Sequence, residues 1–183
     1  MLNEAILFLL DAILQSFAAI MLLRFHLQWM RVPLRNPVGE LVMSLTDFLV
    51  LRARRYIRSV SGLDTATLLL AFLIEAVYLA CVLWLQGYAF SVIGLFALSV
   101  VKLLKISLYL LMGAVFAQVI LSWVNPYAAS ALEVITRRFL QPLRNVVPML
   151  GMVDLTPMLF LIVCQLIMML PIAMLESLAY RVL

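Results

Sequence analysis

Long apolar segments alternate with shorter polar ones along this chain. The predominantly hydrophobic runs occupy residues 2–29, 65–86, 88–124 and 157–175. A helix of about 20 apolar residues spans a hydrocarbon core of about 30 Å, and these runs approach or exceed that length. The pattern therefore predicts an all-α, polytopic transmembrane protein, in which membrane-spanning helices are joined by polar connections.

The third run allows two interpretations. At about 1.5 Å per residue it would form a helix of about 55 Å, longer than one crossing needs. Lys102 and Lys105 divide it. If residues 106–124 alone span, residues 88–101 are a re-entrant, interfacial or helix-extending piece, and the protein has four crossings. If both halves cross, there are five, and the two polar connections face opposite sides.

Basic residues favour four crossings. Residues 30–64 and 125–156 hold nine of the 13 Lys and Arg residues. With four crossings these connections share one face, which the positive-inside rule makes cytoplasmic. We therefore expect a multi-pass membrane protein with basic loops in the cytoplasm and both termini outside.

Composition supports a membrane protein and argues against nucleic-acid binding. Hydrophobic residues make up 67% of the 183 residues and charged residues 12%, whereas a soluble domain is about a quarter charged. The net charge of +4 comes mainly from the arginines of the connections, so the expected partners are the bilayer and its anionic headgroups. A membrane-protein partner and a homo-oligomer stay open. Cys81 and Cys164 lie in apolar runs without a metal or redox spacing, which is typical of packing residues.

The two polar connections are copies of one another. The aligned pairs are Thr46 with Thr136, Arg54 with Arg144, Asp64 with Asp154 and, after four extra residues in the first connection, Trp29 with Trp123. Asn-Pro follows the tryptophan in each copy, as Asn36-Pro37 and Asn125-Pro126. The repeat predicts two tandem helical hairpins, residues 1–87 and 88–183, related by an axis along the membrane normal.

Each copy places an aspartate directly before its second apolar run. The first four N–H groups of a helix have no partner within it, and an Asp at the N-cap accepts from them and faces the positive end of the dipole. We therefore predict that Asp64 and Asp154 cap the two return helices. Pro157 fits the first helical turn, where its missing N–H is no loss. An acid exposed for catalysis or ion binding is the alternative.

The segment before the first cap is amphipathic. Its apolar residues recur at helical spacing opposite Glu40, Ser44 and Asp47, and they are Val38, Leu41, Val42, Leu45, Phe48 and Leu49. The second copy shows a weaker stripe, Leu132, Ile135 and Phe139. Such a helix could lie in the headgroup layer, with the following arginines at lipid phosphates, or pack beneath the bundle.

Ionisable residues inside the apolar runs are hypotheses for function. Asp11 and Glu75 would lie near the middle of the membrane, where two carboxylates could share a proton or hold a cation; the alternative is that each is neutral or paired. We expect Arg24 to snorkel towards the cytoplasmic face. Lys102 and Lys105 are expected to pair with Glu176.

Nothing in the sequence has the pattern of an enzyme. His26 is the single histidine, and no dinucleotide-binding, P-loop, zinc-protease or serine-hydrolase motif is present. We therefore predict no catalytic, cofactor-binding or metal-binding residues. His26 could in principle be an axial ligand of haem, although its counterpart in the second copy is Ile120 and a structural role is the alternative.

With these motifs in place, the chain resembles the YggT (YlmG) family of integral membrane proteins. Members carry one or two copies of a unit with "P-x-R-R-x-I-P" followed by "G-G-x-D-x-S-P". The second copy here carries the resemblance best, in Pro142, Leu143, Arg144, Pro148, Gly151, Asp154, Thr156 and Pro157. The first copy departs from it, with Arg52 and Arg58 in place of the two prolines and Thr67 in place of the last.

The resemblance implies little about function. Plastid relatives are similar to assembly factors for covalent haem attachment to the b-type cytochrome, or are linked to nucleoid and membrane organisation, and bacterial members suggest a role in osmotic stress and ion homeostasis. The leading hypothesis is a non-enzymatic membrane assembly or organisation factor whose loops around Arg54 and Arg144 contact anionic lipid or a partner protein. A small oligomeric transporter or channel that uses Asp11 and Glu75 is the alternative, and haem handling through His26 is a weaker one.

Overall fold

The computed structural model describes residues 2–32, 37–59, 62–145 and 154–183, and every regular element within these residues is helical. The elements are α1 (Leu2–Leu10), η1 (Asp11–Gln15), α2 (Ser16–Trp29), α3 (Pro37–Ala53), α4 (Thr65–Leu85), α5 (Val92–Val124), α6 (Pro126–Arg144), α7 (Thr156–Ile167), η2 (Met168–Ile172) and α8 (Ala173–Val182). The predicted all-α class is confirmed. The elements η1 and η2 are π-turns within otherwise continuous α-helices.

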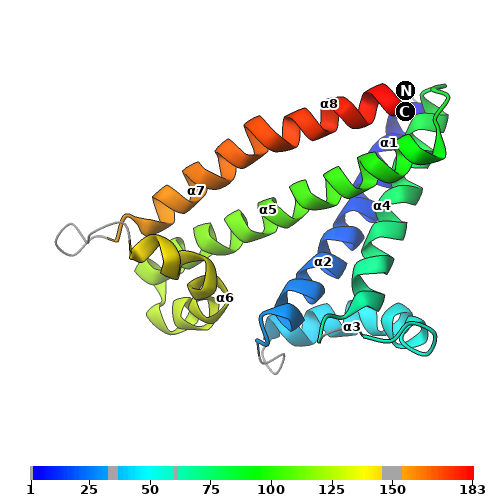
Figure 1. The fold of residues 1–183 in the computed structure, drawn as a ribbon. Helices are drawn as coiled ribbons and strands as arrows, with labels where there is room; N and C mark the ends of the chain where they lie inside the picture. The colour runs from blue at the N-terminus through cyan, green and yellow to red at the C-terminus, as the bar shows by residue number, and fades with distance from the viewer. Residues whose placement is uncertain (1, 33–36, 60–61, 146–153) are drawn as a thin grey trace. The chain divides into compact units, whose positions relative to one another are not determined.

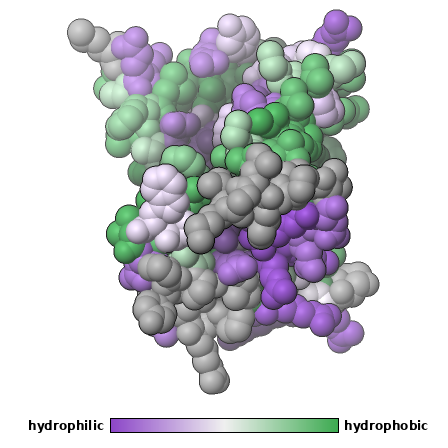
Figure 2. Space-filling model, turned by 90° about the vertical axis from the view of Figure 1, so that its left-hand side faces the viewer, coloured by the Kyte–Doolittle hydropathy of each residue, from purple (hydrophilic) through white to green (hydrophobic). Residues whose placement is uncertain are grey.

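Four helices in the described part of the chain are long and apolar enough to cross a membrane. They run over Leu2–Trp29, Thr65–Leu85, Val92–Val124 and Thr156–Val182. Large hydrophobic side chains such as Phe8, Ile93 and Met169 are exposed on them. Figure 2 shows broad hydrophobic areas on the surface. These side chains would face lipid, so the chain is a multi-pass membrane protein.

The helix α5 answers the question about residues 88–101. It begins at Val92 and continues without a break to Val124, which at about 1.5 Å per residue is about 50 Å. Of the alternatives, the helix-extending one is correct, and a second crossing in this stretch is not formed. Four candidate spans therefore remain, one for each apolar run.

The chain folds into two compact units. The first unit comprises Met1–Ser107 with Ile172–Leu183, and the second comprises Leu108–Pro171. Packing defines these two units, whereas the predicted boundary at residue 87 separates the two sequence repeats. The boundary at residue 87 therefore stays a prediction.

In the first unit α2 and α4 lie side by side, and α3 lies across their ends (Figure 1). Small residues allow the close approach of the two long helices, since Ala18 and Ala71 are both fully buried. Close packing between small residues is a common way to associate helices where lipid supplies no hydrophobic driving force. The opposite end of this unit holds both chain ends and the turn before α5 (Figure 1).

Three side chains link α5 to the C-terminal helix α8 in the first unit. Lys102 Nζ lies 3.1 Å and Lys105 Nζ 2.5 Å from the carboxylate of Glu176. The predicted pairing of these residues is confirmed. Charges within an apolar helix are tolerated when they pair in this way.

The second unit packs the C-terminal half of α5 against α6 and α7. Its core cluster consists of Val115, Leu140, Phe160 and Cys164, one or two from each helix. Cys164 is 3% exposed, as expected of a packing residue. The helix α6 begins at Pro126 and α3 at Pro37, so both connecting helices start at the proline of Asn-Pro.

The helix α3 has three faces. Val42, Thr46 and Val50 are buried against the bundle. Much of the predicted apolar stripe is exposed instead, including Leu41 (59%) and Phe48 (59%). This one helix thus has a side facing the bundle, a side available to lipid and a polar side. The helix therefore packs beneath the bundle and also presents an apolar face outward, and its position in the headgroup layer stays a prediction.

Candidate functional site

An Arg–Asp pair stands at the start of the first return helix. Arg54 follows the last residue of α3, and its Nη2 donates to Asp64 Oδ2 at 2.5 Å. Asp64 is the N-cap of α4, and its Oδ1 accepts from the backbone N–H of Thr67 at 3.4 Å. The predicted capping role of Asp64 is confirmed. The same carboxylate also anchors the end of the basic connection to the helix that it caps.

Two further side chains complete this first Arg–Asp pair. The hydroxyl of Thr67 donates to Asp64. When the side-chain amide of Gln28 on α2 is turned so that its nitrogen and oxygen exchange places, the nitrogen donates to Asp64 Oδ2 at 2.6 Å and the oxygen accepts from Arg54 Nη2 at 2.9 Å. The pair thus joins α2, α3 and α4 at one end of the first unit.

A second Arg–Asp pair occupies the equivalent positions of the second unit. Arg144 is the last residue of α6, and its Nη2 lies 3.0 Å from Asp154 Oδ2. Glu133 lies 3.6 Å from Arg144 Nη1. Here the capping prediction needs a correction, because the N-cap is Leu155 and α7 starts at Thr156. Asp154 still accepts from the first helical N–H, that of Thr156, at 2.9 Å.

Charge and hydrogen bonding favour the ionised form of both aspartates. Burial alone raises the pKa of Asp64, but hydrogen bonds from Arg54 and Thr67 and the charge of Arg54 outweigh it, so the pKa lies below its ordinary value. Burial also raises the pKa of Asp154, and hydrogen bonds from Thr156 together with the charge and hydrogen bond of Arg144 lower it by more. Each pair is therefore an ion pair at neutral pH.

Arg24 is a second polar link between α2 and α3. It is 2% exposed, its Nη1 donates to the Thr46 hydroxyl at 2.5 Å, and it lies 2.7 Å from Asp47 Oδ1. Arg24 therefore reaches α3 and pairs with its carboxylate, and the expectation that it snorkels towards the cytoplasmic face stays a prediction. The equivalent contact in the second unit is a hydrogen bond from Thr136 to Gln118.

The two intramembrane acids lie near one another. Asp11 begins the π-turn η1 and accepts from the Tyr78 hydroxyl at 2.8 Å. Glu75 is one turn from Tyr78 on α4 and is fully buried. Among the residues that the structure describes, neither carboxylate oxygen of Glu75 has a hydrogen-bond partner. A buried carboxyl without partners is costly unless it holds a proton or a bound cation.

His26 has the contacts of a structural histidine. It is 5% exposed, its Nδ1 lies 2.7 Å from the carbonyl oxygen of Leu22, and its Nε2 lies 2.8 Å from the Ser107 hydroxyl. Both ring nitrogens are therefore engaged. Within the described residues, no group of three His, Cys, Asp or Glu side chains is placed to hold a metal ion.

The remaining motif residues fall mainly at helix ends. Trp29 is the last residue of α2, Trp123 lies next to the end of α5, Asn125 precedes α6, Pro142 lies in the last turn of α6, and Pro157 is in the first turn of α7. Asn36, Pro148 and Gly151 lie outside the described residues. The two tryptophans thus lie at helix ends, as expected of indoles that anchor at the headgroup level.

Two features of the site are absent from the sequence interpretation. The repeat aligns Arg54 with Arg144 and Asp64 with Asp154, but it did not predict that each arginine pairs with the aspartate of its own copy. In both copies the opposite charges are ten residues apart, and this spacing was a usable signal. The contact of Arg24 with Thr46 was also missed. That contact could have been inferred from the same alignment, which sets Arg24 opposite Gln118 and Thr46 opposite Thr136.

Comparison with known proteins identifies relatives across nearly the whole chain. The uncharacterized protein PA0392 of Pseudomonas aeruginosa is 33% identical over 177 residues, which cover 93% of this chain and 90% of the relative. The uncharacterized protein YggT of Escherichia coli K12 is 27% identical over 166 residues, covering 88% and 86%. No solved structure shows significant similarity.

The CCB3/YggT family matches two segments, residues 3–85 and 97–175. Their starts are 94 residues apart (97 against 3) and their ends 90 (175 against 85), which agrees with four extra residues in the first connection. Two family segments in one chain are consistent with tandem repeats. The chain therefore belongs to the CCB3/YggT family, as a two-repeat, multi-pass membrane protein related to the bacterial YggT proteins.

Proposed function

We propose that this protein is a non-enzymatic organising or assembly factor of the bacterial inner membrane, and that its basic connections contact anionic lipid headgroups in the cytoplasmic leaflet. The observation that carries the proposal is the exposed apolar face of α3, followed directly by exposed arginines. Leu41, Leu45 and Phe48 are open on this face, and Arg52 and Arg55 are exposed just beyond it. An apolar face with adjacent cations is typical of a helix at the headgroup layer.

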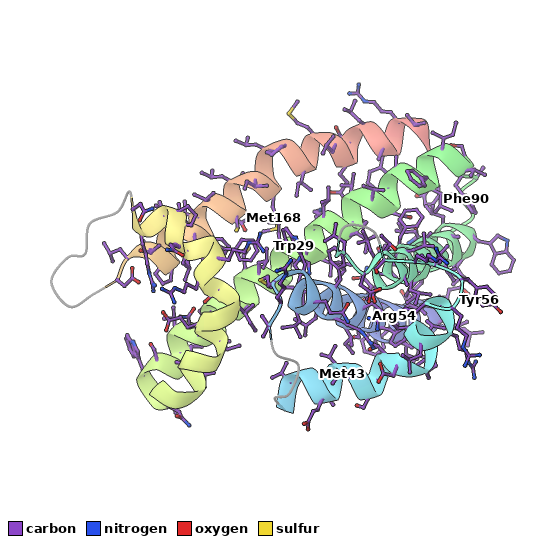
Figure 3. All side chains as sticks on the ribbon, turned by 60° about the horizontal axis from the view of Figure 1, so that its bottom comes forward. Trp29, Met43, Arg54, Tyr56, Phe90 and Met168 are labelled. Atoms are coloured by element: carbon purple, nitrogen blue, oxygen red, sulfur yellow. The ribbon has the colours of Figure 1, made fainter. Side chains whose placement is uncertain are left out.

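The arginines divide into two groups in this proposal. Arg54 and Arg144 hold the Arg–Asp pairs, with side chains 40% and 32% exposed, so each has surface left for a second partner. Arg55 and Arg137 are exposed and supply charge directly. Tyr56, 90% exposed, also lies at the outer edge of the molecule, whereas Arg54 lies further inside (Figure 3). A partner membrane protein or a second copy of this chain would bind the same basic surface.

Photo-crosslinking tests the proposal. A photoreactive residue at position 55 or 137 should capture anionic lipid or one discrete membrane protein. The matched control is position 88, where Tyr88 is 63% exposed at the opposite end of the first unit. Capture of neither lipid nor protein at 55 and 137, or equal capture of anionic lipid at 88, would contradict the proposal.

A second candidate function, a small oligomeric transporter or channel in ion balance, is favoured by Glu75. Its fully buried carboxylate has no hydrogen-bond partner within the described part of the chain and lies one turn from the Asp11–Tyr78 bond. A cavity of about 590 Å³ in the first unit is lined by Gln15, Tyr78 and Lys102, among others, so it borders the tyrosine that bonds to Asp11. Intramembrane acids beside polar cavities are common in proton and cation pathways.

Liposome flux separates the two functions. If the transporter proposal holds, purified protein carries protons or cations, and Glu75→Gln reduces the flux at least tenfold while Glu133→Gln, a charge change far along the sequence in the second unit, leaves it unchanged. Equal flux in wild type and Glu75→Gln would exclude this use of Glu75. The lipid-contact proposal would be unaffected.

A further inference from the structure

Two cavities of similar size lie in the first unit at the end where the first Arg–Asp pair stands. The first, the basic cavity, has a volume of about 580 Å³ and is lined by Gln28, Arg54, Ile57, Arg58, Ser59 and Asp64, with Gly62. Its charged side chains are two arginines and one aspartate. Arg54 is neutralised by Asp64, so Arg58 supplies the excess positive charge of the cavity.

The second, the apolar groove, has a volume of about 590 Å³. Aromatic and aliphatic side chains from α2, α4 and α5 dominate its lining, including Phe25, Trp29, Leu69, Phe72 and Val100. Its size and lining are those of ligand sites, and these residues belong to membrane-spanning helices. Acyl chains are the apolar molecules present at this depth.

The basic cavity and the apolar groove meet. Ile57 lines both. Gln28 lines the basic cavity and its neighbour Trp29 lines the groove. In the same way, Asp64 lines the basic cavity and its neighbour Thr65 lines the groove. One amphipathic molecule could therefore occupy both, with its polar group in the first and its apolar part in the second.

The backbone of Arg58 is tied to the start of α4. The Thr65 hydroxyl donates to the carbonyl oxygen of Arg58 at 2.7 Å. This bond holds the backbone of Arg58 beside a residue that lines the groove, so the cation is tethered close to the apolar surface. Such proximity suits a ligand whose phosphate and acyl chain are covalently joined.

We infer that the first unit binds one anionic phospholipid, with the phosphate group against Arg58 and Arg54 in the basic cavity and an acyl chain in the apolar groove. This inference rests on the proposed function, since it gives the general contact with anionic lipid a specific site. The site belongs to the first repeat, because the second repeat has Pro148 where the first has Arg58. The departure of the first copy from the family motif is thus the source of the binding charge.

Trp29 provides the readout, because it lines the groove. In a background with Trp84→Phe and Trp123→Phe, purified protein is reconstituted in zwitterionic phosphatidylcholine vesicles, and brominated-chain phosphatidylglycerol or phosphatidylcholine is titrated in. Bromine quenches indole fluorescence on contact. We expect brominated phosphatidylglycerol to quench Trp29 at lower mole fraction than brominated phosphatidylcholine.

Charge variants test the headgroup part. Arg58→Gln should reduce the preference for phosphatidylglycerol about tenfold, the loss expected for one charge-assisted contact. Arg181→Gln is the matched control, since Arg181 is exposed near the end of α8 and does not line the basic cavity, and it should keep the preference. Inorganic phosphate alone should give no quenching and should not displace the brominated lipid, which distinguishes a lipid from a free anion.

Groove variants test the acyl-chain part. Val100→Phe fills the groove and should weaken quenching by both brominated lipids, whereas Val77→Phe, at a position 53% exposed on α4, should not. If Arg58→Gln reduces the preference no more than Arg181→Gln does, the specific site is wrong and general lipid contact stands. If the protein with Trp29 as its single tryptophan shows no preference for phosphatidylglycerol, the site is wrong, and crosslinking at positions 55 and 137 still decides the proposed lipid contact.

Discussion

Single residues show how the two repeats have diverged around a shared contact. Arg24 and Gln118 occupy equivalent positions, and each bonds to the equivalent threonine, Thr46 or Thr136. An arginine buried at 2% exposure needs an anion, and Asp47 supplies it at 2.7 Å. The first repeat therefore uses an ion pair where the second uses a neutral amide.

The contact predicts an order of stabilities. Arg24→Gln imitates the second repeat and keeps a hydrogen bond to Thr46, so it should destabilise by about 1 kcal/mol, whereas Arg24→Leu loses the bond and the ion pair with Asp47, for about 2–3 kcal/mol. Chemical denaturation in detergent measures both. Adding Asp47→Asn should relieve part of the Arg24→Leu defect. Equal loss in both single variants would show that the hydrogen bond to Thr46 is unimportant.

The Arg54–Asp64 pair predicts a pH dependence of stability. The pKa of Asp64 is lowered in the folded protein, so its contribution is complete above the ordinary value of 3.8 and is lost as the pH falls through the lower folded pKa. Asp64→Asn keeps an N-cap side chain but loses the ion pair. The difference in unfolding free energy between wild type and Asp64→Asn should be constant above about pH 4 and shrink below it.

Thermal unfolding from about pH 3 to about pH 7 measures this difference on both sides of the ordinary aspartate pKa. Asp64→Ala loses the cap as well as the charge, so it should be less stable than Asp64→Asn by about 1 kcal/mol at every pH. If the difference in unfolding free energy between wild type and Asp64→Asn grows as the pH falls, the ion pair does not stabilise the protein in the way expected here.

At the scale of elements, α5 contains two glycines in contrasting surroundings. A Cβ on Gly94 would clash with the backbone of Leu183, because the end of α8 crosses α5 there. Ser91 strengthens the same contact, since its N–H donates to the Leu183 carbonyl oxygen at 2.7 Å and its hydroxyl donates to that of Val182 at 2.7 Å. Gly113 has open space around it within the described structure. Gly94 is thus a packing requirement and Gly113 is not.

Alanine at each glycine tests this difference. Gly94→Ala should separate α8 from α5 and destabilise the first unit by about 1–3 kcal/mol, as overpacking does. Gly113→Ala should be neutral or stabilising by up to about 1 kcal/mol, because alanine favours helix. Disulfide formation between Ser91→Cys and Leu183→Cys, with Cys81 and Cys164 replaced by serine, reports the contact. Unimpaired crosslinking in Gly94→Ala would show that the helices can shift at no cost.

Elements also show where sequence patterns are informative. The length of the apolar runs predicted the candidate spans, and the N-cap rule predicted the role of Asp64. Periodicity did not identify the buried side of α3, because a lipid-facing stripe and a core-facing stripe have the same hydrophobic spacing. Thr46 on the buried side has a polar side chain, and its burial is explained by the hydrogen bond from Arg24. The Arg–Asp pairs depend in the same way on tertiary proximity, which one chain's periodicity does not contain.

At the scale of the whole molecule, the tandem repeat predicts that both basic connections face the cytoplasm. Cysteines introduced at positions 55 and 137 should react with an impermeant maleimide only after the cytoplasmic side is opened, and a cysteine at position 88 should react in intact spheroplasts. The basis is the positive-inside rule applied to four spans. Labelling of positions 55 and 137 from opposite sides would require an odd number of crossings between them.

The repeats are not interchangeable parts. The residue that occupies the Asp47 position in the second copy is Arg137, so exchanging α6 for α3 would set a second guanidinium against buried Arg24. Like charges brought together out of water are strongly unfavourable. During folding, the first span therefore rejects α6 in place of α3. The polar contact between Arg24 and α3 favours cognate pairing within the first repeat, and a chimeric protein that carries α6 in place of α3 would lose it.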